Sequence, residues 1–186
     1  MKKQLGKIGC ILCLCIVFYW CGRIYSVNSN YEDNRIVYDI GETVYISDIE
    51  IKCVEARLYS LEEFKARFGV DNVSLLYPAE DKILCACMNV KNTGKASLSW
   101  DEIMELTLGG FQTVTWGSSA NPYATQKINV FKSDELKSEK EQDIWFVTSL
   151  SHISFKKSTW DDIINEEFYY SPMIEPVQIM MKLDVR

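Results

Sequence analysis

The stretch ILCACMNVK, residues 83–91, decides the fold. It carries no charge before its last residue, and apolar side chains occupy both alternating sets of positions, so neither face of an extended strand here suits water. The turn-forming sequence Asn92-Thr93-Gly94-Lys95 follows directly. This pattern predicts a central β-strand that is covered on both sides.

Other strand-like runs lie before and after this segment. Ile49, Ile51 and Cys53 alternate with charged residues, which predicts a strand with one solvated face. Residues 177–185 alternate in the same way and predict the closing strand. The remaining predicted strands are residues 36–40, 44–46 and 144–147, and a hairpin of residues 104–108 and 111–116 around Gly109-Gly110.

Two segments depart from the strand pattern. Ser60-Leu61-Glu62-Glu63 matches a capping box, which predicts a helix that begins after Ser60 and ends near Gly69. A second short helix is predicted over residues 159–168, before Pro172. With eight to nine short strands, the pattern predicts an all-β, immunoglobulin-like β-sandwich over residues 35–186 with two short helical inserts. An α+β roll is the alternative.

The N-terminal 25 residues predict a hydrophobic helix that meets a membrane. Lys2, Lys3 and Lys7 precede residues 8–22, which contain no charged side chain. As a helix these residues span roughly 22 Å, less than the ~30 Å hydrocarbon layer. They therefore suit either a short anchor or the apolar part of a signal peptide. The flanking lysines predict a cytoplasmic N-terminus and a C-terminal domain outside the cytoplasm.

An uncleaved anchor is the favoured interpretation of residues 1–25, with residues 26–34 as a polar linker. Small residues suited to signal cleavage are scarce after the apolar run, but a cleaved, secreted form is an alternative. A lipoprotein is disfavoured because the bulky Phe18-Tyr19-Trp20 precedes Cys21. The anchor interpretation predicts a single-pass protein of the cell membrane.

The charge distribution excludes one class of partner. The chain has 20 Lys and Arg against 26 Asp and Glu, and four of the basic residues but none of the acidic ones precede Tyr31. The remainder therefore holds 16 basic and 26 acidic residues, a net charge of −10. A surface this acidic repels phosphate backbones, so nucleic acid is not expected as a partner.

The cysteines outside the apolar run are Cys53, Cys85 and Cys87, an odd number. One disulfide from Cys53 to either Cys85 or Cys87 is a candidate in an oxidising compartment, and buried free thiols are the alternative. Cys85-Ala86-Cys87 lacks the second ligand pair of a zinc site, so no metal is expected. No glycine-rich phosphate loop is present, and no cofactor is expected.

No catalytic set stands out. His152 is the only histidine, and no nucleophile motif accompanies it. The acidic pairs Asp161-Asp162 and Glu166-Glu167 match the carboxylates of a glycan hydrolase in type. The first turn of a helix explains the first pair better, and a solvated face the second. We therefore expect no enzyme.

Aromatic residues beside small polar ones mark the candidate interaction sites. Residues 111–123 form the predicted interaction loop, with Trp116 and Tyr123 as candidate contacts for a protein or a sugar. Tyr169 and Tyr170 are a second candidate pair. The alternative is that these rings pack against the edge of the sandwich.

Several pieces of the sequence resemble one group of bacterial domains. Gly41-Glu42-Thr43-Val44, the strand that ends in Asn89-Val90-Lys91-Asn92-Thr93-Gly94-Lys95, and Ser158-Thr159-Trp160-Asp161-Asp162 carry the likeness. The group comprises telokin-like, immunoglobulin-like extracellular domains of unknown function in membrane-anchored or secreted proteins of Gram-positive bacteria. The resemblance implies a fold and a location, and no functional residue.

These observations together predict a membrane-anchored, extracytoplasmic protein with a non-enzymatic binding domain. Its expected partners are the membrane, through residues 1–25, and an envelope protein or glycan. An envelope glycan hydrolase and an accessory subunit of a membrane complex are the alternatives.

Overall fold

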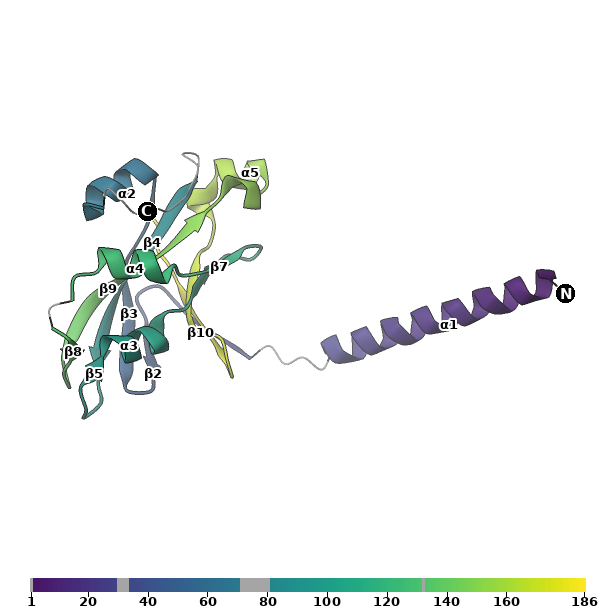
Figure 1. The fold of residues 1–186 in the computed structure, drawn as a ribbon, viewed down its shortest axis with the longest axis horizontal. Helices are drawn as coiled ribbons and strands as arrows, with labels where there is room; N and C mark the ends of the chain where they lie inside the picture. Colours follow the sequence, from purple (N-terminus) through teal and green to yellow (C-terminus); the bar gives the residue numbers. More distant parts are fainter. Residues whose placement is uncertain (1, 30–33, 71–80, 132) are drawn as a thin grey trace. The chain divides into compact units, whose positions relative to one another are not determined.

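A computed structural model describes residues 2–29, 34–70, 81–131 and 133–186. The chain divides into two compact units, Met1–Asn34 and Arg35–Arg186 (Figure 1). The first unit is the helix α1 (Lys2–Ser29), which runs further than the predicted apolar segment and includes the start of the predicted linker. Residues 30–33 of that linker lie outside the described residues. Within the described chain, no helix is both long and apolar enough to cross a membrane.

The second unit contains two main β-sheets (Figure 1). In the first, β1 is parallel to β11, and the other neighbours are antiparallel. The second sheet is antiparallel throughout. The first sheet has the order β1 (Arg35–Tyr38), β11 (Gln178–Lys182), β10 (Tyr169–Met173), β6 (Gly110–Gln112), β7 (Gly117–Ser119). The second has the order β2 (Thr43–Ile46), β3 (Ile49–Tyr59), β4 (Lys82–Asn92), β9 (Glu141–Leu150), and a small sheet pairs β5 (Leu98–Ser99) with β8 (Glu135–Leu136).

The predicted central strand is confirmed as β4, which lies between β3 and β9 and is covered on both faces. One face, with Leu84 and Met88, packs in a cluster that includes Phe111 and Tyr170 of the other sheet. The opposite face contributes Ile83 and Cys85 to a second cluster, which lies under α2 (Leu61–Phe68) and α4 (Pro122–Ile128). Both sets of alternating positions are therefore apolar because each has its own apolar cover.

The capping box before α2 is confirmed. The Ser60 hydroxyl accepts a hydrogen bond from the Glu63 N–H, while the Glu63 carboxylate accepts one from the Ser60 N–H. Gly69 ends the helix in the left-handed conformation at φ 65°, as the sequence predicts.

The predicted hairpin around Gly109-Gly110 is wrong. Its first arm lies in the helix α3 (Trp100–Thr107), which has a capping box of its own between Ser99 and Glu102. The true hairpin joins β6 to β7, and its turn is closed by a hydrogen bond from the Thr113 N–H to the Trp116 carbonyl. Gly109 is required for a different reason, because a Cβ atom there would lie 1.8 Å from the Ser171 carbonyl oxygen.

The second predicted helix is interrupted. Residues 159–168 contain the end of α5 (Lys157–Asp161), the short 3₁₀-helix η2 (Ile163–Asn165) and an extended segment that leads into β10. Another 3₁₀-helix, η1 (His152–Ser154), follows β9. The domain is thus a mostly β sandwich, and α3 and α4 are helices that the sequence interpretation lacked.

The outer edge of β9 is covered by the residues around α4. The Asn129 side chain accepts a hydrogen bond from the Trp145 N–H at 2.8 Å and donates one to the Trp145 carbonyl at 2.8 Å. The Asn121 N–H donates to the Val147 carbonyl at 2.6 Å. The Asn129 side chain and the Asn121 N–H therefore satisfy backbone groups of Trp145 and Val147 that a neighbouring strand would otherwise bind.

Candidate functional site

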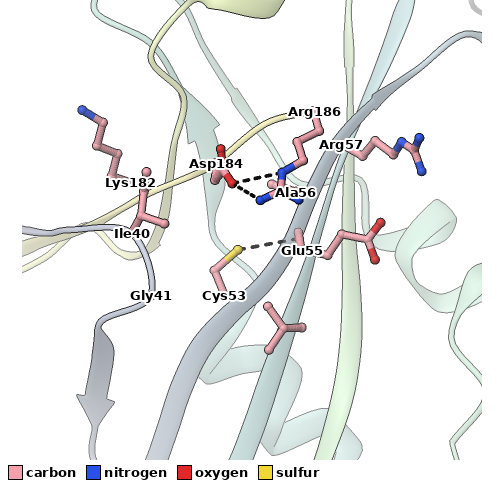
Figure 2. Close-up of a pocket in the computed structure, with 10 residues that line it drawn as sticks. Ile40, Gly41, Cys53, Glu55, Ala56, Arg57, Lys182, Asp184 and Arg186 are labelled. Carbon is pink, nitrogen blue, oxygen red and sulfur yellow. Dashed lines mark hydrogen bonds and ion pairs between the residues drawn. The ribbon is translucent and has the colours of Figure 1, made fainter.

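One pocket forms where β1 and β11 separate. These strands are parallel neighbours in the first sheet. The segments that follow β1 and β11 in the sequence both reach the same edge of β3 in the second sheet. β2 pairs with the first part of β3, whereas the C-terminal residues meet β3 through a parallel bridge of Val185 with Ala56. A pocket of about 650 Å³, here called the fork pocket, lies between these two segments, at Cys53 (Figure 2).

The charges around the fork pocket are largely paired with one another. Asp184 accepts two hydrogen bonds from the Arg186 guanidinium, at 3.1 and 2.7 Å (Figure 2). Lys182 donates to Glu167 at 2.5 Å, and this contact lowers the pKa of Glu167 and raises that of Lys182. Asp184, Arg186 and Lys182 are therefore in ion pairs, while Glu55 and Arg57 add one charge of each sign to the lining.

The thiol in the fork pocket is unreactive in this environment. Burial raises the pKa of Cys53 to about 11, although its hydrogen bond to the Glu55 carbonyl at 3.6 Å acts in the opposite direction. Nucleophilic attack needs the thiolate, which such a pKa makes rare at neutral pH.

The structure does not contain the candidate disulfide from Cys53 to Cys85 or Cys87, and all three cysteines are free thiols in it. A bulge in β3 explains why, because Cys53 pairs with Met88 but Glu55 already pairs with Cys87. Before the bulge Cys53 packs with the core between the sheets, whereas Cys85 belongs to the cluster on the opposite face of β4. The sequence shows the alternation but not the extra residue that changes the face.

We expect the three thiols to react slowly with iodoacetamide at pH 8. Burial raises the pKa of Cys87 to about 12 and that of Cys85 well above its usual value, as it does for Cys53. A pKa near 11 instead of 9.0 lowers the thiolate fraction of Cys53 on the order of 100-fold, so its rate should rise with pH towards 11. Mass spectrometry measures these rates from the peptide that contains Cys53 and the one that contains both Cys85 and Cys87, with fragmentation to separate the last two. Equal rates in the folded and guanidinium-unfolded chain, or failure to label the unfolded chain without a reductant, would contradict the structure.

A second pocket lies beside the predicted interaction loop. It has a volume of about 610 Å³ and is lined by residues of β6, β7, β10 and β11 and by their neighbours. We call it the glutamine pocket, after Gln112 of β6 and Gln178 of β11. Its other polar side chains are Ser118, Ser119 and Ser171, and its apolar wall includes Pro122 and Ile174.

The glutamine pocket is positioned by sheet register. Gln112 and Gly117 are partners in the β6–β7 hairpin, and Ser171 on β10 is the partner of Gly110. The Gln178 amide nitrogen donates to the Gln112 side-chain carbonyl at 3.2 Å, with the Ser171 hydroxyl at 3.5 Å. Ser171 in turn donates to the Ile179 carbonyl at 2.7 Å. The two glutamines are thus held against each other rather than pointing freely into water.

Trp116 lies in a chain of aromatic rings at the other end of the hairpin. Its ring centroid is 5.6 Å from Phe155, which is 5.7 Å from Trp160. Trp160 in turn lies 6.2 Å from His152, whose Nδ1 lies 3.1 Å from the buried carboxylate of Asp81. Phe155, Trp160 and His152 line a pocket of about 560 Å³ with Lys157 and Asp161. Trp116 is half-buried, and its ring packs against the other rings of this cluster. This is in line with the alternative interpretation, in which the aromatic rings pack against the sandwich.

The other candidate aromatic residues differ in exposure. Tyr123, in α4, is 52% exposed, and the Lys127 ammonium lies 5.5 Å from its ring centre. Tyr169 is half-buried and donates to Glu167 at 3.1 Å. Tyr170 is fully buried, donates to the Thr107 carbonyl at 2.5 Å and accepts from the Gly109 N–H at 2.9 Å. Its assignment as a displayed binding residue is therefore wrong.

The acidic pairs do not lie together in one of these pockets. Asp161 lines the pocket formed with Trp160 and His152. The Glu167 carboxylate is instead bound by Lys182 and Tyr169. Asp162 accepts a hydrogen bond from Asn165 at 2.5 Å. Within the described residues, no group of three or more His, Cys, Asp and Glu side chains is arranged to hold a metal ion.

No model of a known protein family matches the sequence, and the search of curated proteins gives no match. Among solved structures, an uncharacterised β-sandwich protein from Clostridium difficile 630 is similar, with a TM-score of 0.50 and 12% identity over 82% of this chain and 97% of that one. A conserved hypothetical protein from Bacillus anthracis has a TM-score of 0.48 and 8% identity over 77% of this chain and 94% of that one. A functionally unknown protein from Listeria monocytogenes EGD-e has a TM-score of 0.40 and 8% identity over 69% of each chain.

The first of these similarities shows the fold alone. It confirms the predicted β-sandwich class, a fold that an uncharacterised protein of a Gram-positive bacterium shares. The predicted interaction loop, residues 111–123, supplies part of the lining of the glutamine pocket, but neither Gln112 nor Gln178 was singled out from the sequence. Gln112 and Gln178 are separated by 66 positions, and no local motif marks either of them.

Proposed function

We propose that α1 anchors the chain in a membrane and that the domain is a non-enzymatic binding module outside the cytoplasm. The observation that carries the anchor is the exposure of apolar side chains in the described part of α1. They include consecutive positions on all sides of the helix, namely Leu14, Ile16, Val17, Phe18, Tyr19, Trp20, Ile24 and Tyr25. A helix that is apolar around its circumference is stable only in apolar surroundings.

The flanking charges support the anchor and its orientation. Lys7 and Arg23 bracket the apolar run, and their long side chains can reach the two interfaces of a bilayer that the run alone does not span. The lysines before the run and the acidic remainder favour a cytoplasmic N-terminus. The same segment would be removed if it acted as a cleaved signal, which would release the domain.

Membrane association is tested by substituting the apolar run. We expect the full chain to remain in membranes after a carbonate wash, and Ile16→Glu/Val17→Glu to release it because two carboxylates cannot enter the hydrocarbon layer. The matched control is Val114→Glu/Val130→Glu, two valines of the domain that are each 86% exposed. A wild-type chain in the soluble fraction, or an unchanged distribution of the first variant, would contradict the anchor. The intact mass of the membrane-bound chain distinguishes an anchor from a cleaved signal.

We also propose that the sandwich is of the immunoglobulin-like, telokin-like type and that it binds an envelope protein or glycan. The two facing sheets and the turn sequences quoted above support the first point. The pockets beside the predicted interaction loop support the second, because concave sites with a few fixed polar groups are typical of ligand binding. The raised pKa of the Cys53 thiol in the fork pocket favours binding over catalysis by this cysteine.

A further inference from the structure

We propose that the glutamine pocket binds a neutral glycan that bears acetamido groups. This inference rests on the proposed role of the domain as a binding module, but it does not depend on the anchor. It assigns a ligand class to a site assembled from β6, β7, β10 and β11.

The described lining of the glutamine pocket carries no charged side chain. Its thirteen residues include no Asp, Glu, Lys, Arg or His, although a quarter of the chain is charged. An ionic ligand that entered this pocket would lose water without gaining a counter-charge, which is costly. The pocket therefore discriminates in favour of uncharged ligands, and the net negative charge of residues 31–186 further disfavours anions.

The two glutamines have hydrogen-bonding groups that their contact with each other does not use. Gln178 uses its nitrogen toward Gln112 and Ser171, and Gln112 uses its carbonyl toward Gln178. In the described part of the chain, no hydrogen-bond partner is found for the Gln112 nitrogen or the Gln178 carbonyl oxygen. The Gln112 amide nitrogen and the Gln178 carbonyl oxygen thus remain available to a ligand. The carbonyl or the N–H of an acetamido group can bind one of them, and a sugar hydroxyl can bind the other.

The glutamine pocket also has an apolar wall and a volume suited to a small ligand. Ile174 is 65% exposed, and it lines the same pocket as Pro122. These side chains suit the methyl group and the C–H face of a sugar, which the hydroxyl of Ser119, on the same face of the hairpin as Gln112, complements. A volume of about 610 Å³ lies within the range of small-ligand pockets.

A peptide is the competing ligand, because its backbone also offers an amide. Peptides commonly bind a sheet edge as an added strand. The edge strand here is β7, which is only three residues long, and its Ser119 carbonyl already accepts a hydrogen bond from Thr148 at 3.1 Å. This edge gives little support to an added strand, so the geometry favours a compact sugar unit.

Calorimetric titration of the full chain tests the inference, in a detergent without a sugar head group. The probe is a tetramer of N-acetylglucosamine, and a glucose tetramer is the control ligand without acetamido groups. We expect the acetylated tetramer to bind at least about tenfold more tightly, the effect of about one good hydrogen bond. Gln112→Glu replaces the donor with an acceptor of the same shape and should weaken binding by a similar factor. Gln126→Glu, on the exposed face of α4, makes the same chemical change outside the pocket and should leave binding unchanged.

Thermal unfolding of each variant separates a folding defect from a binding defect. If Gln112→Glu unfolds, Ile174→Asp tests the apolar wall instead, at an exposed side chain. Equal affinity for the two tetramers, no binding, or equal effects of Gln112→Glu and Gln126→Glu would overturn the inference. Binding of an acetylated tripeptide in place of the sugar would also overturn it, but would leave the proposed binding function standing. If cell-envelope protein and glycan extracts also contain nothing that the full chain retains, the proposed binding function fails as well.

Discussion

Gly109→Ala is expected to destabilise the domain by more than about 3 kcal/mol, because it forces a backbone clash. The added Cβ would lie 1.8 Å from the Ser171 carbonyl oxygen and 2.7 Å from the Pro172 Cα. The position of a Cβ atom is fixed by the backbone, so no change of rotamer relieves the contact. The strand β10 would have to move away from the junction of α3 and β6. That movement would also break the hydrogen bond from Gly109 to the buried Tyr170 hydroxyl.

Gly117→Ala is the matched control for this substitution. It lies in the neighbouring strand β7, and its added Cβ would meet nothing nearer than the Gln112 Cβ at 3.7 Å, an ordinary contact. Urea unfolding of the full chain, followed by tryptophan fluorescence, measures both variants. We expect Gly117→Ala to change the free energy of unfolding by less than about 1 kcal/mol. Similar stability for the two variants would show that β10 does not pass as close to Gly109 as described.

Asn129→Ala is expected to lower the free energy of unfolding by about 2 kcal/mol, because it leaves the Trp145 N–H and carbonyl without protein partners. The same side chain also donates to the Thr125 carbonyl at 2.6 Å, so the end of α4 should loosen with it. The edge of β9 would then be open to pairing with another chain. Urea unfolding measures the loss of stability, and light scattering at increasing protein concentration measures the tendency to associate.

Asn165→Ala provides the control for Asn129→Ala. Asn165 is exposed, and its side chain donates only to the neighbouring Asp162 carboxylate. Its removal should change the free energy of unfolding by less than about 0.5 kcal/mol and should not promote association. An equally small effect at Asn129 would mean that water replaces the side chain at the edge of β9.

The parts of the fold that the sequence predicted correctly are those with a strong local signal. Residues 83–91 could only be a doubly covered strand because both alternating sets are apolar, and the Ser60 capping box determines the start of α2 by its own hydrogen bonds. The α3 helix carried the same signal at Ser99 and Glu102. There the short apolar run before Gly109-Gly110 looked equally suited to a strand, since five residues do not separate a helical from an extended period.

The candidate site could not be predicted in the same way, because its residues meet only through tertiary structure. Gln112, Ser171 and Gln178 come from three strands, and their contact depends on the register of β10 with β6 and β11. The sequence identified the candidate aromatic residues but not which of them are exposed and which are buried. Aromatic residues are suited both to display and to core packing, and Tyr170 is buried because its hydroxyl has partners at Thr107 and Gly109.

The sidedness of the domain is the central claim, and protease added to intact, wall-free cells that express the full chain tests it most directly. We predict that the protease degrades residues 35–186 from outside while a cytoplasmic marker protein stays intact, leaving a short membrane-bound fragment that contains α1. If the domain survives until the cells are lysed, it faces the cytoplasm and the account is contradicted.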